Sequence, residues 1–383
     1  MKQQNLRVAV IEPVGGHGGM DYYDFGLCRG LVNSGVDVVL HTCNKTVRPT
    51  DSGFSIRHTY QDIYGVAPSW RRGLRYIRGS VSAIWSAMRE HRSICHFHLF
   101  HVGFLEVFNI ALAKLLLRRV VITAHDVESF VDSLEVPALS RWVYRRADRI
   151  IAHNLVSRQE LVERLGLNDN KIAVIPHGNY LHTIHSLPVQ SDARRTLNVP
   201  DEAKVILFFG QIKDVKGLDL LLDAMPQVLE KNPDTVLLIA GKPWKSDFSI
   251  YDTQMEKLGI RGCCITHIRY IPDDEVPLYY SAADLVALPY RRIYQSGVVL
   301  MAMSYGKAVL VSDLPGMTEI VSDGHTGYVF RQGVVSDLEQ KVCSALEDGG
   351  EREILAKEGF NRVRDDYDWT VIGNKTSELY QSF

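Results

Sequence analysis

The segment that decides the fold is 284–330, which reads DLVALPYRRIYQSGVVLMAMSYGKAVLVSDLPGMTEIVSDGHTGYVF. Residues 285–288 form a short apolar run typical of a buried parallel strand, and 308–311 form a second one. Between them, Ser296 and Gly297 precede an apolar segment of helical length. The pattern predicts a strand–helix–strand unit. The first turn of such a helix suits a phosphate, because its N–H groups are unpaired and small residues let a ligand approach.

Apolar strands and amphipathic helices alternate through the rest of the chain, which predicts an α/β fold with doubly wound parallel sheets. The expected strands are 6–11, 36–40, 93–98, 120–124, 148–152, 172–175, 205–209, 235–240 and 263–268. The expected helices are 20–34, 103–117, 155–165, 218–230, 274–282 and 369–380. Residues 179–195 lack apolar periodicity, so we expect an interdomain linker there. A length of 383 residues suits two domains, which we place at 1–184 and 185–366, with a final helix in 367–383.

Composition indicates an ordinary globular protein, with 46% hydrophobic and 23% charged residues. No apolar stretch reaches the length of a membrane span, and no signal-peptide pattern is evident at the start. The six cysteines are scattered without CxxC spacing, which favours free thiols in a reducing compartment. We therefore expect a cytoplasmic protein.

Charge is distributed unevenly along the chain. Residues 1–184 carry 22 Lys and Arg against 16 Asp and Glu, and the remainder carries 21 against 29. Within the basic half, 64–93 combines arginines with aromatic and aliphatic residues at helical spacing, namely Trp70, Arg71, Arg72, Arg75, Tyr76, Ile77, Arg78, Val81, Ile84 and Trp85. This pattern fits a helix lying on an anionic membrane surface, and it also fits a solvated helix over an ordinary core.

Five short motifs stand where strands end and helices begin. They are the glycine-rich turn at 15–19, Thr123 to Asp126 (TAHD), Ile175 to Gly178 (IPHG), Gly210 to Gly217 (GQIKDVKG), and the Ser296-Gly297 pair. The glycine-rich turn is not a dinucleotide fingerprint, because Asp21 stands where the third glycine of GxGxxG belongs. Open α/β sheets bind their ligands at the carboxyl ends of the strands, so these positions are candidates for a binding site.

Together, in this order, the motifs resemble those of GT-B glycosyltransferases of the family 4 (group 1) type. The resemblance implies two Rossmann-like domains facing each other across a cleft, with the last helix crossing back to the first domain. It also implies a retaining transfer of a sugar from a nucleotide-diphosphate sugar to a hydroxyl acceptor, by front-face attack. UDP- and GDP-sugars are the expected donors, and a lipid-linked saccharide in polysaccharide or glycolipid assembly is the expected acceptor.

The resemblance also assigns site residues. His125 and Asp126 are the catalytic candidates, with His17 and His98 on the acceptor side and His177 as a structural residue. The donor-binding candidates lie in the glycine-rich turn, the GQIKDVKG loop, the turn after 263–268 and the segment 291–298. They are Gly16, Gly18, Gly210, Gln211, Lys213, Lys216, Tyr270, Ile271, Arg291, Gln295, Ser296, Gly297 and Val298, of which Lys213, Arg291 and Gln295 are our own additions to the family pattern. Lys216 matches the lysine of the family's diphosphate clamp.

Two departures from the family pattern affect the donor site. Gln211 stands where the clamp usually has an arginine, and Lys213 is a candidate to supply that charge. Ile293 and Met301 stand where many members carry two glutamates, the second of which holds the donor ribose. The chain resembles a subgroup without this pair. We expect Arg291 or Arg292, Gln295 and the backbone of 296–298 to hold the ribose and sugar instead.

Two functions other than transfer fit the same sequence pattern. A nucleotide-sugar 2-epimerase and a catalytically silent nucleotide-sugar-binding module are both compatible with the same fold. The DxD-like sequence 366–368 reads as a charged helix start, so we expect no metal and no cofactor. The basic residues match no nucleic-acid-reading motif, so we expect no nucleic-acid partner.

Overall fold

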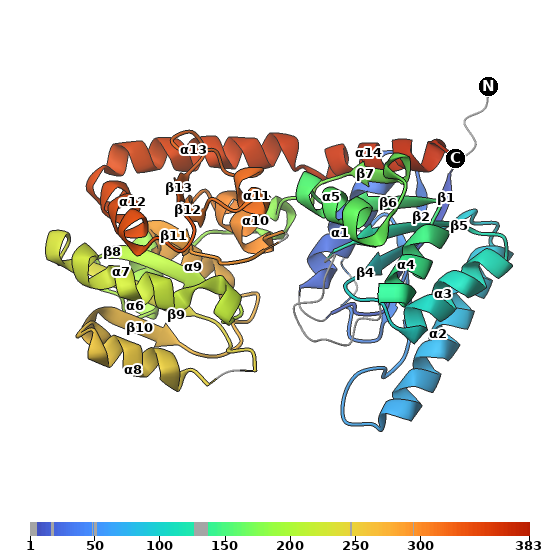
Figure 1. Cartoon of the computed structure of the whole chain (residues 1–383), viewed down its shortest axis with the longest axis horizontal. Helices are drawn as coiled ribbons and strands as arrows, with labels where there is room; N and C mark the ends of the chain where they lie inside the picture. Colours follow the sequence, from blue (N-terminus) through green and yellow to red (C-terminus); the bar gives the residue numbers. More distant parts are fainter. Residues whose placement is uncertain are drawn as a thin grey trace. The chain divides into compact units, whose positions relative to one another are not determined.

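The computed structural model describes residues 6–16, 19–47, 49, 52–125, 137–245, 247–293 and 295–383 (Figure 1). The chain forms two compact units. The first contains Met1–Gly178 and Tyr367–Phe383, and the second contains Asn179–Asp366. The chain thus enters the second unit after Gly178, whereas the sequence analysis had placed the boundary at residue 184.

The first unit is built on a seven-stranded parallel sheet with the order β3-β2-β1-β4-β5-β6-β7. Its strands are β1 (Arg7–Glu12), β2 (Asp37–Cys43), β3 (Ser55–Tyr60), β4 (Ile94–Leu99), β5 (Arg119–Ala124), β6 (Arg149–Ala152) and β7 (Ile172–Val174). The central strands are buried on both faces, which explains their continuous apolar runs. The strand order reverses between β1 and β4, so the carboxyl ends of these two strands lie at the point where such sheets bind ligands.

Helices cover this sheet, and the last helix of the chain is one of them. They are α1 (Met20–Asn33), α2 (Ser69–Arg89), α3 (Phe104–Leu115), α4 (Pro137–Arg146), α5 (Leu155–Leu165) and α14 (Trp369–Gln381). Helices α1 and α14 cross with their backbones in contact, since a Cβ on Gly373 would lie 2.1 Å from the carbonyl carbon of Gly30. Only glycine permits this approach.

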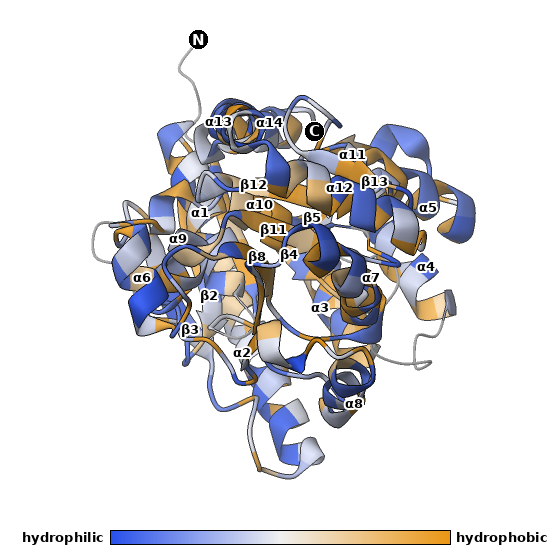
Figure 2. Ribbon diagram, turned by 90° about the vertical axis from the view of Figure 1, so that its left-hand side faces the viewer, coloured by the Kyte–Doolittle hydropathy of each residue, from blue (hydrophilic) through white to orange (hydrophobic). Residues whose placement is uncertain are grey.

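The second unit has a six-stranded parallel sheet with the order β10-β9-β8-β11-β12-β13. The strands are β8 (Lys204–Phe209), β9 (Thr235–Ala240), β10 (Cys264–His267), β11 (Leu285–Leu288), β12 (Ala308–Ser312) and β13 (Tyr328–Phe330). The helices are α6 (Gln190–Thr196), α7 (Leu218–Lys231), α8 (Ser249–Lys257), α9 (Val276–Ala282), α10 (Gly297–Ser304), α11 (Pro315–Thr318), α12 (Val335–Glu347) and α13 (Gly349–Asp366). The strand order reverses between β8 and β11, so a ligand is expected to bind beside the loops that follow these two strands. Figure 2 shows these two strands in hydrophobic colours and α6 largely in hydrophilic ones.

The expectation of a linker at 179–195 was wrong. The segment carries a short 3₁₀ turn, Leu181–Thr183, and most of α6, and it belongs to the second unit. Helix α6 is held by the buried Arg194, whose guanidinium donates to the carbonyl of Ala282 (3.1 Å) and to Asp284 Oδ2 (2.9 Å). Because an arginine rather than an apolar stripe anchors this helix, hydrophobic periodicity could not reveal it.

Among the described helices, none combines the length and the hydropathy that a membrane span requires.

Candidate functional site

The loop of the second unit that was predicted to bind phosphate follows β8 and is shaped by glycines. Gly210 has φ 104°, and a Cβ on Gly241, in the loop after β9, would lie 1.8 Å from the Gly210 carbonyl oxygen. Gly217 has φ 65°, and a Cβ there would lie 2.0 Å from the carbonyl oxygen of Pro289. Side chains are therefore excluded at these points, and the loop 210–217 packs directly on the backbone that follows β9 and β11.

Lys216 lies at the centre of this loop, and its ammonium group faces other predicted donor residues. Its Nζ is 5.1 Å from the ring centroid of Tyr290. A Cβ built on Gly210 would be 3.4 Å from Lys216 Nζ and 3.5 Å from Val298 Cγ2. The structure thus brings Gly210, Lys216 and Val298 together within one unit.

Helix α10 begins beside this lysine. Ser296 is its N-cap, and the Ser296 hydroxyl accepts a hydrogen bond from the amide of Val299 (3.3 Å). A Cβ on Gly297 would lie 2.5 Å from the Tyr180 hydroxyl, so only glycine fits there. The first-turn amides and the positive end of the helix dipole therefore lie near the Lys216 ammonium.

Arg291, a predicted donor-binding residue, is paired with an acid of α7. Its guanidinium forms a bidentate pair with Asp219, with Nη1 2.6 Å from Oδ1, and it also donates to the Asp214 carbonyl (3.1 Å). Its amide donates to the carbonyl of Val215 (2.8 Å). Arg291 therefore fastens the loop that carries Lys216, and its place in the donor site stays a prediction.

The remaining donor candidates are less closely grouped. Lys213 Nζ lies 5.3 Å from the ring centroid of Trp244, a residue that the sequence analysis missed. The signal for Trp244 was its position in the loop after the predicted strand 235–240, three residues beyond Gly241. In the turn after β10, Tyr270 is 67% exposed and Ile271 is buried. Gln211 and Gln295 are half-buried and Arg292 is exposed.

The first unit gathers histidines at the carboxyl edge of its sheet. His98 lies near the end of β4, His125 and His153 directly follow β5 and β6, and His177 follows β7. Tyr23 of α1 lies among them, with its ring centroid 4.6 Å from that of His125 and 5.5 Å from that of His153. His125 also stacks on Phe100, with centroids 4.5 Å apart and ring planes at 12°.

Hydrogen bonds define the tautomers of two of these rings. The Ile175 carbonyl can only accept, so His153 Nδ1 donates to it (3.1 Å), and the neutral ring then has a lone pair at Nε2. His125 Nδ1 donates to this lone pair (3.3 Å), which leaves His125 Nε2 as an acceptor. That atom is buried and has no hydrogen-bond partner among the described residues.

Burial keeps both rings neutral. It lowers the pKa of His153 to about 3 and holds the pKa of His125 well below its ordinary value, with neighbouring histidines adding to both effects. His125 is therefore suited to accept a hydrogen bond rather than to act as a cation.

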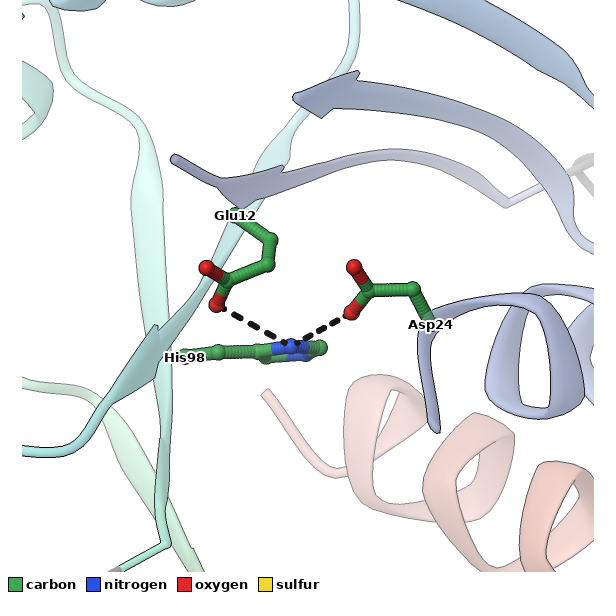
Figure 3. A group of neighbouring side chains, drawn as sticks. All are labelled: Glu12, Asp24 and His98. Atoms are coloured by element: carbon green, nitrogen blue, oxygen red, sulfur yellow. Dashed lines mark ion pairs between the residues drawn. The ribbon is translucent and has the colours of Figure 1, made fainter. Parts of the chain in front are cut away.

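His98 is enclosed with two acids that the sequence analysis missed, Glu12 and Asp24 (Figure 3). His98 Nδ1 lies 3.1 Å from Asp24 Oδ1 and 3.7 Å from Glu12 Oε2, and all three side chains have no exposed surface. Burial raises the pKa of Glu12 to about 8 and that of Asp24 well above its ordinary value, and it lowers the pKa of His98 to about 4. The signal for Glu12 was an acid at the end of an otherwise apolar strand.

The glycine-rich turn after β1 packs on the loop after β2. The Gly16 amide donates to the Thr46 hydroxyl (3.1 Å), and a Cβ on Gly16 would lie 2.6 Å from the Lys45 carbonyl oxygen. The absence of a side chain at Gly16 is explained by this packing. His17, Gly18 and Asp126 lie outside the described residues.

The basic segment 64–93 contains the long helix α2. Trp70, Leu74 and Trp85 on this helix are 63%, 58% and 50% exposed. Arg71, Arg75 and Arg78 are exposed beside them, and Gly79, Ala83, Ile84 and Ala87 form the buried face. One face thus packs on the core, and the other combines aromatic and basic side chains.

Comparison with known proteins places the chain in a family. Residues 189–362 match the family model described as "Glycosyl transferases group 1", and residues 17–179 match the model "Glycosyltransferase Family 4". A D-inositol 3-phosphate glycosyltransferase of Nocardia farcinica is 30% identical over 226 residues, which cover 58% of this chain and 49% of that protein. The chain spans about half the length of the first curated relatives that it matches.

Solved structures share the fold over nearly the whole chain. Sucrose-phosphate synthase from Thermosynechococcus elongatus has a TM-score of 0.79 at 18% identity, covering 98% of both chains. Anabaena HepE in complex with UDP-glucose has a TM-score of 0.76 at 17% identity, covering 99% of this chain and 100% of that one. The two parallel-sheet units match these structures, and the two family models account for both halves of the sequence. The chain therefore belongs to the group 1 (family 4) glycosyltransferases and has the GT-B fold.

Proposed function

We propose that the chain transfers a glycosyl group from a nucleoside-diphosphate sugar to a hydroxyl acceptor with retention of configuration. The observation that carries the proposal is the placement of Lys216 in the second unit, where its ammonium faces Gly210 and the first turn of α10. A lysine ammonium beside a helix N-terminus, on a loop whose glycines allow close backbone approach, is suited to a diphosphate.

The same groups support the chemistry of transfer. The bond between the anomeric carbon and the donor phosphate oxygen breaks, and the acceptor oxygen forms the new bond on the same face. The acceptor proton passes to the departing phosphate. Lys216 and the α10 amides stabilise the negative charge that grows on that phosphate.

His125 has a positioning role in this proposal. Its Nε2 is an unprotonated acceptor, so it binds a sugar or acceptor hydroxyl rather than neutralising charge. The low pKa of His125 makes it a weak base, which agrees with a mechanism in which the leaving phosphate takes the proton.

UDP-sugars are the first donors to test, because the similar HepE structure holds UDP-glucose. For the acceptor, the exposed aromatic and basic face of α2 supports a substrate presented at an anionic membrane surface, as a lipid-linked saccharide would be. We also propose that transfer requires no metal on the donor phosphates. The Lys216 ammonium and the first-turn amides of α10 supply positive charge to the donor phosphates, which is the role that a metal ion would otherwise have.

Product analysis tests the reaction against its two alternatives. The chain is incubated with UDP- and GDP-sugars, with and without hydroxyl acceptors, and free nucleotide, free sugar, isomerised donor and glycosylated acceptor are quantified. Transfer, or slow hydrolysis in the absence of acceptor, is expected in the wild type and in Lys257→Ala, an exposed control on α8, and is expected to be lost in Lys216→Ala. An isomerised donor would identify an epimerase, and binding without any product would identify a silent binding module.

A further inference from the structure

Three buried side chains meet where β1, β4 and α1 come together in the first unit. Glu12 ends β1, His98 lies on the neighbouring strand β4, and Asp24 projects from the second turn of α1. None of the three side chains has exposed surface. Figure 3 shows both carboxyl groups on the same side of the imidazole, with the two dashed lines meeting at one ring nitrogen.

Most of the polar atoms of this triad lack hydrogen-bond partners. Glu12 Oε1 accepts from the Val14 amide (2.5 Å). Glu12 Oε2, both oxygens of Asp24 and both ring nitrogens of His98 make no hydrogen bond with any described residue. Leaving so many buried polar atoms unpaired is costly, and a bound species that contacts all three side chains would remove that cost.

The spacing of these atoms fits a single ion. Two ligand atoms that each lie about 2.1 Å from a metal can be at most about 4.2 Å apart. His98 Nδ1 is 3.1 Å from Asp24 Oδ1 and 3.7 Å from Glu12 Oε2, both within that limit. One ligand atom from each of the three residues lies within 4.8 Å of the others. A small inward movement of these side chains would therefore bring all three atoms within coordination distance of one ion.

We propose that Glu12, Asp24 and His98 bind one divalent transition-metal ion of the Zn²⁺ or Mn²⁺ class inside the first unit. One imidazole nitrogen with two carboxylates suits these ions, whereas Mg²⁺ and Ca²⁺ prefer oxygen ligands alone. Two carboxylates and a neutral imidazole also balance the charge of a divalent cation, which an apolar interior requires.

The ion would act as a structural link. It would join β1 and β4 to α1, the helix that carries Tyr23 among the histidines. The rings of Tyr23 and His96 meet His98 edge to face, with centroids 5.1 Å and 4.9 Å away, and so hold the imidazole in its orientation. The triad belongs to the first unit, whereas the Lys216 loop belongs to the second.

Metal content after controlled refolding tests the proposal. The full chain is unfolded in guanidinium with EDTA, refolded with Zn²⁺, Mn²⁺ or Mg²⁺, passed through gel filtration and analysed for bound metal and thermal midpoint. About one Zn²⁺ or Mn²⁺ ion per chain and a raised midpoint are expected for the wild type, since an ion that binds only the folded state stabilises it.

Variants separate the triad from other metal-binding side chains. Asp24→Asn and His98→Gln are expected to lose the ion and the metal-dependent rise in midpoint. The control His41→Gln removes a buried imidazole from β2 outside the triad and is expected to retain both. Far-UV circular dichroism and nucleotide binding by the second unit report whether each variant has folded. A wild type without bound ion, one that takes up only Mg²⁺, or equal retention by Asp24→Asn, His98→Gln and the wild type would overturn the proposal.

Discussion

His153 Nε2 lies 3.3 Å from His125 Nδ1, and His153 Nδ1 lies 3.1 Å from the carbonyl oxygen of Ile175. This chain of two hydrogen bonds runs from the end of β7 across β6 to β5. It fixes which nitrogen of His125 carries the proton, because a backbone carbonyl cannot donate. His153 thus controls His125 without itself being assigned a contact with substrate.

Replacing His153 with Leu should lower kcat by about 10-fold or more and leave the KM for the donor nearly unchanged, because the His125 tautomer and orientation are lost. His153→Gln should recover much of the rate, since an amide can both donate to Ile175 and accept from His125. Steady-state kinetics with the best donor check both variants. Equal losses in the two variants, or a change confined to KM, would contradict the positioning role.

The pair of Arg291 with Asp219 leads to a second prediction. Asp219→Asn should weaken nucleoside-diphosphate binding by about 10-fold, even though Asp219 itself would repel a phosphate, because the loop that carries Lys216 loses its brace. Arg291→Ala should weaken binding by a similar factor, and the double variant should be little worse than either single one. Titration calorimetry measures all three. If Arg291 held the ribose directly, Arg291→Ala would be much more harmful than Asp219→Asn.

The buried side chain of His41 should make the free energy of unfolding depend on pH. It is fully buried on β2, and burial, followed by the charges of Arg57 and Arg92 and opposed by Glu90, lowers its pKa to about 3. Between that value and the unfolded pKa of about 6.5, the unfolded chain binds one more proton at this residue, so stability falls as pH falls.

His41→Leu should remove this contribution. The free energy of unfolding should then depend less on pH below 6.5, by up to about 1.4 kcal/mol per pH unit. Urea unfolding at several pH values between 5.5 and 7.5, followed by tryptophan fluorescence, measures the slope. An unchanged slope would show that His41 titrates normally in the folded protein.

The exposed face of α2 predicts binding to anionic vesicles. Replacing Arg71, Arg72, Arg75 and Arg78 with Gln should remove most of the binding, at about 1 kcal/mol per arginine, and added salt should weaken binding by the wild type. The double variant Trp70→Ser, Trp85→Ser should also bind vesicles more weakly, because the two exposed indole rings can no longer insert into the membrane interface. Co-sedimentation with anionic and zwitterionic vesicles across a salt series is the measurement. Vesicle binding that changes neither with added salt nor with replacement of the four arginines would show that this face of α2 does not bind membranes.

Much of the fold could be predicted from local sequence because the central strands are buried on both faces. The apolar run 285–288 corresponds to β11 without error, and the predicted helix 155–165 corresponds to α5. The edge strand β3 was not expected, because Ser55–Tyr60 is only partly buried and contains arginine and histidine. Helix α6 was missed because the buried Arg194 anchors it.

The candidate site was predictable only in part. Motif spacing identified the Lys216 loop and the start of α10, since both follow directly from strand ends. The partner of Arg291 could not be predicted, because Asp219 lies 72 positions away in sequence and meets it only through the fold. The same holds for Glu12, Asp24 and His98, which come from two strands and a helix.

The most direct test of the account is calorimetric titration of UDP, GDP and their common sugar conjugates into the wild type, Lys216→Ala and the control Lys257→Ala. We predict that one nucleotide binds the wild type and Lys257→Ala with micromolar affinity and that Lys216→Ala loses at least about 10-fold, as expected when a charge-assisted contact to phosphate is removed. No binding of any nucleotide by the wild type, or equal binding by all three proteins, would contradict the assignment of this loop as the donor site.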